Sequence, residues 1–144
     1  MTTEDPYVRK KLAVNAYASK NDLHGTVVAV LRGTLQDRNL SLIPQPSRVV
    51  LRGDIHELIA TDEEAAPGSN VGRVAYVAFV EFHNGGVLVR GDQVVIGGQV
   101  VGHLAGFDLS HAPNHMNVVV GGSLVSGEER GLQVGMEVLF RMVD

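Results

Sequence analysis

Short runs of valine, leucine and isoleucine recur along the chain, and glycine or proline separates most of them. In residues 74–83 both alternating sets of positions are largely apolar, which is typical of a strand buried on two faces. No segment of about twelve residues combines a helical period with capping residues, and the nearest candidate is 10–20. The pattern therefore predicts an all-β fold. Its further strands are expected at 12–17, 24–33, 49–51, 55–60, 87–90, 93–96, 99–107, 117–120 and 137–142.

Seventeen glycines between such short strands favour a strongly bent or closed sheet. The two-residue breaks Gly91-Asp92 and Gly97-Gly98 are typical of tight hairpins, because glycine adopts positive φ without penalty. Residues 34–48 are expected to form a loop or an edge excursion, and residues 61–72 a linker-like loop. We predict a small closed β-barrel with short hairpins and little helix, a single domain over residues 1–144 with a flexible start at 1–11.

Composition narrows the function classes. A net charge of −4 without clustered basic residues argues against nucleic-acid binding. The chain has no cysteine, which excludes disulfides, thiolate metal sites and a cysteine nucleophile. The longest apolar run, 74–80, is far shorter than the roughly 20 residues that span a bilayer, so no membrane segment is expected. With no signal peptide visible, we expect a bacterial, cytoplasmic protein.

The stretch 102–117 is unusually polar for a structural barrel and holds three of the six histidines. Pro113 disfavours a helix there, so His111 and His115 are not expected to form a helical metal-binding pair. We interpret the part around Pro113, between the two expected strands, as a loop whose ends present polar side chains at a barrel rim, where functional residues often collect. Its polar members are His103, Asp108, Ser110, His111, Asn114, His115 and Asn117.

A second group lies on the most apolar strand, where Glu81 and His83 share one face near a turn. Burial raises the pKa of a carboxyl group. Such a carboxyl group beside an imidazole can serve in general acid–base catalysis. A weaker third group comprises His56, Glu57 and Asp62.

The leading hypothesis is a small metabolic enzyme that performs acid–base chemistry on a small polar metabolite. Its expected catalytic residues are Glu81, His103 and His115, with Glu81 or His115 as the base. The expected substrate-binding residues are His83, Asp108, His111, Asn114 and Asn117. A divalent zinc or iron held by histidines is an open alternative, and so is a purely structural role for each histidine.

The C-terminal third resembles the glucitol/sorbitol-specific IIA component of the bacterial sugar phosphotransferase system. The shared features are Gly102-His103, Phe107-Asp108, Pro113, the apolar run 118–121, and the motif Gly135-x-x-Val138-x-Phe140. This resemblance implies a small β-barrel and a non-catalytic alternative, either small-molecule-binding or phosphocarrier-like. The stretch from His56 through the HAPNH loop also resembles an uncharacterised family of small bacterial proteins. A further alternative is a homo-oligomeric structural subunit that buries the 74–80 strand against its copies.

Overall fold

The computed structural model describes residues 20–143. The flexible start, the strand expected at 12–17 and nearly all of the helical candidate at 10–20 lie outside that range. Within it the chain forms strands and no helix, and therefore no helix long and apolar enough to cross a membrane. The strands are β1 (Leu23–Val30), β2 (Thr34–Leu35), β3 (Leu40–Ser41), β4 (Ser47–Val50), β5 (Ile55–Thr61), β6 (Asn70–Val71), β7 (Val74–Phe82), β8 (Gly86–Val89), β9 (Gln93–Ile96), β10 (Gln99–Asp108), β11 (Asn117–Gly122) and β12 (Glu137–Arg141).

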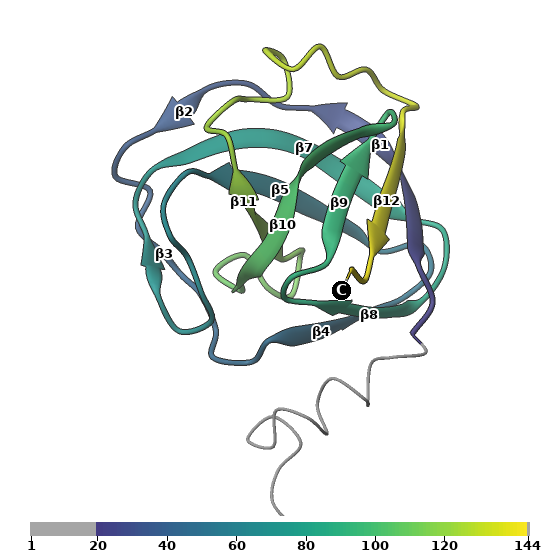
Figure 1. Cartoon of the computed structure of the whole chain (residues 1–144), viewed down its shortest axis with the longest axis horizontal. Helices are drawn as coiled ribbons and strands as arrows, with labels where there is room; N and C mark the ends of the chain where they lie inside the picture. The colour runs from purple at the N-terminus through teal and green to yellow at the C-terminus, as the bar shows by residue number, and fades with distance from the viewer. Residues whose placement is uncertain (1–19, 144) are drawn as a thin grey trace, which may run out of the picture.

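Seven strands close into a barrel in the order β1-β12-β9-β10-β11-β5-β7, and β7 pairs back onto β1 (Figure 1). The predicted closed barrel is confirmed. Every neighbouring pair is antiparallel except β11 and β5, which run parallel. A parallel pair cannot be joined by a tight turn, and here the intervening chain passes through several other strands before β11.

The barrel interior is filled by aliphatic side chains and three fully buried phenylalanines. The rings of Phe82 and Phe140 stack with centroids 5.3 Å apart. The β4–β8 pair lies across one end of the barrel (Figure 1) and adds Val50 and Leu88 to this core. Valine and leucine at these positions explain how a chain without tryptophan fills its interior.

A second apolar layer, which we call the outer cluster, packs on the outside of the barrel. It comprises Leu40, Leu42, Ile59, Val71, Val74, Ala105 and Val119. The stretch 34–48 holds two short strands, of which β2 pairs with β7 as an edge excursion and β3 carries Leu40 into the outer cluster. The prediction that 61–72 is a loop was wrong at Asn70–Val71, which form β6 and pair with β3. Most of β7 is therefore covered on both faces within the chain, and the homo-oligomer alternative stays a prediction.

The two glycine breaks differ. Gly97-Gly98 forms the predicted two-residue hairpin, with φ values of 58° and 83° between the paired residues Ile96 and Gln99. Gly91-Asp92 does not, because β8 pairs with β4 while β9 pairs with β10 and β12. The buried Asp92 carboxylate accepts a hydrogen bond from the Val89 backbone and lies 3.0 Å from Lys20 Nζ. It stabilises a corner between two sheets.

Candidate functional site

Five of the six histidines lie at one end of the barrel, which we call the histidine end. Here β1, β5 and β11 begin while β7, β10 and β12 end. Antiparallel pairing brings these strand ends together although they are far apart in sequence. The histidines are His24, His56, His83, His111 and His115. The loop 109–116 between β10 and β11 lies at this end, and the start of β5 lies beside the start of β11.

Three polar side chains form a continuous row across this end, which we call the polar row. Asp108 of β10 pairs with Asn117 of β11, and Asn117 pairs with Glu57 of β5. Directly paired residues point to the same face of a sheet. Their exposed fractions are 3%, 0% and 8%, respectively. A buried polar group destabilises the fold unless it is hydrogen-bonded. The hydrogen-bond partners of each side chain therefore show whether it is structural or available to a ligand.

The Asp108 carboxylate is surrounded by donors from its own chain. Oδ2 accepts from the Ser41 backbone at 3.1 Å, and Oδ1 accepts from the Ser110 backbone at 3.0 Å and from the Ser110 hydroxyl. Burial alone raises the pKa of Asp108, but these hydrogen bonds and one from Asn117 outweigh it and hold the pKa below the ordinary 3.8. Asp108 is therefore an ionised anchor for the start of the loop.

Asn117 has an acceptor that the protein leaves unused. Its Nδ2 donates to Asp108 Oδ1 at 3.1 Å, and an ionised carboxylate can only accept, so this contact fixes which way the amide faces. Asn117 Oδ1 is then directed elsewhere, and within residues 20–143 no donor reaches it although it is buried.

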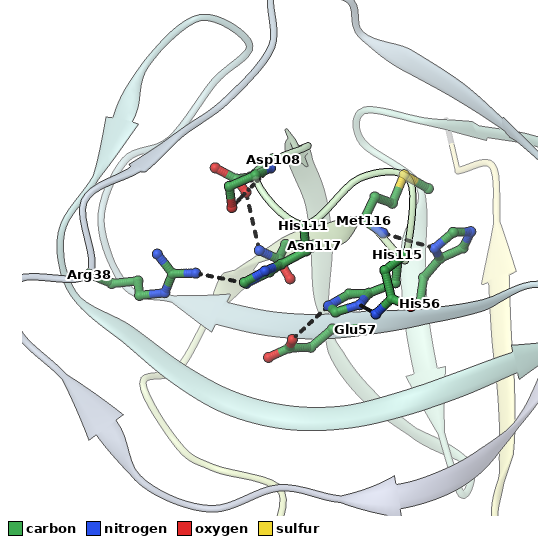
Figure 2. A network of polar contacts seen from close by, with 10 residues as sticks. Arg38, His56, Glu57, Asp108, His111, His115, Met116 and Asn117 are labelled. Carbon is green, nitrogen blue, oxygen red and sulfur yellow. Dashed lines mark hydrogen bonds and ion pairs between the residues drawn. The ribbon is translucent and has the colours of Figure 1, made fainter.

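His115 forms the centre of the site, as Figure 2 shows. Its Nε2 lies 3.3 Å from Glu57 Oε1, with only 13% and 11% of the two side chains exposed. Its Nδ1 lies 2.9 Å from the Asn114 amide nitrogen. An amide nitrogen donates, so Nδ1 accepts, and the ring proton sits on Nε2 facing Glu57. The ring is also held by Phe79, edge-on at 5.1 Å, and by His111, stacked at 5.0 Å.

His111 links the site to the solvent-exposed surface. Its Nε2 lies 3.3 Å from Arg38 Nη2, which comes from the segment after β2 (Figure 2). A guanidinium only donates, so this imidazole nitrogen accepts. The contact places a permanent positive charge beside the stacked imidazoles.

His56 supports the loop from the other side. Its Nδ1 accepts a hydrogen bond from the Met116 backbone at 3.1 Å, and its Nε2 lies 3.4 Å from the Asp54 carboxylate. Burial lowers the pKa of His56 from the ordinary 6.5; Asp54 opposes that shift, and His115 and Arg48 add to it. Neutral His56 therefore holds the residue next to His115 in place.

The structure brings together most of the predicted loop residues but not the predicted acid. Asp108, His111, Asn114, His115 and Asn117 all lie in one connected network. The expected convergence of these imidazoles with the acid of the central apolar strand was wrong, because the acid that meets His115 is Glu57 of β5. The strand β7 contributes Phe79 instead.

The other three predicted residues lie elsewhere. Glu81 pairs with Thr26 and Ile55 in the sheet, and its side chain makes no hydrogen bond or ion pair within the described range. The exposed His83 contacts the Thr26 hydroxyl through its Nε2. His103 is exposed too, and pairs with Gly121, four residues beyond Asn117 along β11.

Sequence reasoning gave Glu57 too little weight and missed Arg38. The available signal was that Glu57 comes directly before the apolar run of β5, as Asn117 comes directly before that of β11. What the sequence did not disclose is that these two strands lie side by side in parallel. Over residues 20–143, no group of three or more potential His, Asp or Glu ligands is arranged to hold a metal ion.

A protein-family model described as a family of unknown function (DUF6917) matches residues 17–141. No curated protein and no solved structure matches the chain. The resemblance to the glucitol/sorbitol IIA component is therefore not confirmed by these comparisons, whereas membership of an uncharacterised family is.

Proposed function

The chain belongs to DUF6917, a family of unknown function, and we propose from its site that it is an acid–base enzyme acting on a small polar metabolite. His115 is the proposed base and Glu57 its positioning residue. This proposal keeps the reaction class expected from the sequence and replaces Glu81 by Glu57 as the acidic partner.

The observation that carries the proposal is the contact between His115 Nε2 and Glu57 Oε1. A carboxylate that accepts from one ring nitrogen fixes the tautomer, leaves the other nitrogen with a free electron pair, and stabilises the imidazolium that forms when that nitrogen takes a proton. Here the other nitrogen is Nδ1, whose partner Asn114 lies in an exposed turn. A substrate proton would replace the Asn114 amide at Nδ1.

The surroundings favour a substrate with an anionic group near the proton that is removed. The Arg38 guanidinium at His111 lies within the same network as His115. A guanidinium binds a carboxylate or a phosphate in a bidentate manner, through two parallel hydrogen bonds. In this picture Arg38 and His111 orient the substrate, and His115 accepts its proton.

Deuterium exchange tests the proposal while the substrate is still unidentified. The protein is incubated in D2O with mixtures of small hydroxy, keto and amino acids, and proton NMR follows the loss of C–H signals. We expect at least one compound to exchange or turn over. His115→Gln should slow this by about 100-fold or more, the usual contribution of a general base, and Glu57→Gln should slow it less.

A matched control is His24→Gln, because His24 is an exposed histidine at the same end whose side chain is outside the network. It should leave exchange unchanged. Since His115 also holds the loop, each variant is first checked for an intact fold by its amide NMR spectrum. If no compound exchanges with the native protein, or if folded His115→Gln is as fast as native, the proposal is wrong.

A further inference from the structure

A second candidate site lies on the same β10–β11 hairpin, away from the polar row. It is an open hollow of about 340 Å³, within the size range of small-molecule pockets. Its wall combines two basic side chains with small and aliphatic residues. The lining residues are Ala65, Arg90, Gly91, His103, Leu104, Ala105 and Gly121.

The two basic side chains of the hollow have no polar partner in the part of the chain that the structure describes. Arg90 and His103 form no side-chain hydrogen bond or ion pair with any residue in the range 20–143. Asp92, only two residues from Arg90, does not neutralise it, because the Asp92 carboxylate is buried and lies against Lys20. Within residues 20–143, therefore, no carboxylate forms an ion pair with the Arg90 guanidinium at this hollow.

The backbone beneath these groups is fixed. The Arg90 amide donates to Pro46 at 2.8 Å, and the Gly91 amide donates to Leu104 at 2.8 Å. These contacts hold the corner between β8 and β9 against β10, so the Arg90 side chain starts from a defined position. A preorganised cation loses less free energy on binding than one on a mobile loop.

The small residues leave room beside the charge. A Cβ placed on Gly121 would meet only the His103 carbonyl oxygen, at an ordinary 3.7 Å. The absence of a side chain at Gly121 is therefore not a packing requirement of the strand. Together with Ala65 and Ala105, it keeps the hollow open next to His103.

We propose that this hollow binds the carboxylate or phosphate of a small metabolite, with Arg90 and His103 as the anion-binding residues. The guanidinium supplies paired donors for the anion, and the imidazole supplies a further donor. Ala65 and Ala105 contact a compact aliphatic part of the ligand. This proposal is independent of the acid–base function, since neither basic residue belongs to the network around His115.

Titration of the ¹⁵N-labelled protein with inorganic phosphate, and separately with succinate, tests the proposal. We expect saturable shifts of the Gly91, His103 and Gly121 amides with at least one probe, and the stronger probe identifies the preferred anion. Arg90→Gln should weaken this binding at least about tenfold, because it removes the only permanent charge of the hollow. His103→Gln should weaken it less.

Two further variants separate specific binding from general surface charge. Arg52→Gln removes an exposed arginine from the turn after β4 and should not change the affinity. Gly121→Leu places a side chain at the hollow where a Cβ is tolerated, and should abolish binding while the remaining spectrum stays native-like. The proposal is overturned if neither probe gives saturable shifts at these amides, or if Arg90→Gln binds as the native protein does.

Discussion

The outer face of the β10–β11 hairpin carries polar side chains towards both of its ends, and the two ends are built differently. In the polar row, Asp108 and Asn117 are buried and bonded to one another and to nearby donors. At the other end, His103 lies beside Gly121, is exposed and has no partner among residues 20–143. The outer cluster, through Ala105 and Val119, separates them.

This difference separates two uses of polar side chains in one small barrel. Hydrogen bonds to buried groups position a loop, since leaving any of those groups unpaired costs about 1–3 kcal/mol. Exposed groups without partners contribute little to folding and are free to meet a ligand. We therefore expect the polar row to dominate stability, and the hollow to affect binding alone.

We expect Asn117→Asp to cause the largest loss in the free energy of unfolding. It replaces the amide that donates to Asp108 by a third carboxylate in the row, between Asp108 and Glu57. A buried charge without a counterion costs about 3–5 kcal/mol, so urea denaturation at neutral pH should show a loss of that order, partly recovered in acid. Asn70→Asp, at an exposed position of β6, is the control and should be nearly neutral. An equal response of the two variants would contradict the burial argument.

A somewhat smaller loss is expected from Asp108→Ala. It leaves the Ser41 and Ser110 backbone amides and the Asn117 amide without their acceptor. We expect a loss of about 3 kcal/mol in the free energy of unfolding. Arg90→Ala, at the other end of the hairpin, should change it by less than about 0.5 kcal/mol. If Arg90→Ala proved as destabilising as Asp108→Ala, the division between the two ends would be lost.

The smallest expected effect is on the pH dependence of the free energy of unfolding. The pKa of His56 is lowered from 6.5 in the folded state, so just below pH 6.5 the unfolded chain binds a proton at His56 more readily than the folded chain does. The free energy of unfolding therefore falls as the pH drops below 6.5. One such group contributes at most about 1.4 kcal/mol per pH unit. His56→Asn keeps an acceptor for the Met116 amide and should flatten this part of the profile.

The test compares urea midpoints of native and variant protein at about pH 7 and about pH 5. Asp108 does not contribute to the difference between these two pH values. Its pKa is lowered from 3.8, so the stability that it contributes is lost only at still lower pH. Identical slopes for the two proteins would show that His56 does not carry the dependence.

The barrel could be predicted because its determinants are local. Alternating or continuous valine runs indicate strands, and Gly97-Gly98 indicates its hairpin from two residues alone. Gly91-Asp92 has a similar local sequence but turns a corner, because the Asp92 carboxylate is held by Val89 and by the distant Lys20. Such a partner is not visible in a local pattern.

The candidate site could be predicted only as far as it lies in one stretch. The loop residues 108–117 stand out because several polar types occur together in an apolar chain. The sequence favours Glu81 as their acid, since it shares the most apolar strand with His83. Choosing Glu57 requires knowing that β5 lies beside β11, and that neighbour relation depends on the closure of the whole barrel.

The parallel pairing of β5 with β11 has a consequence for the order of folding. Glu57 and His115 are 58 residues apart, and three of the seven barrel strands, β7, β9 and β10, lie between them in the chain. Contacts between residues so far apart in sequence require a large loop to close, which costs conformational entropy. Folds with many such contacts fold slowly. We therefore expect the imidazole–carboxylate pair to form late in folding, once β11 has paired with β5, and not in a nascent chain that ends before β11.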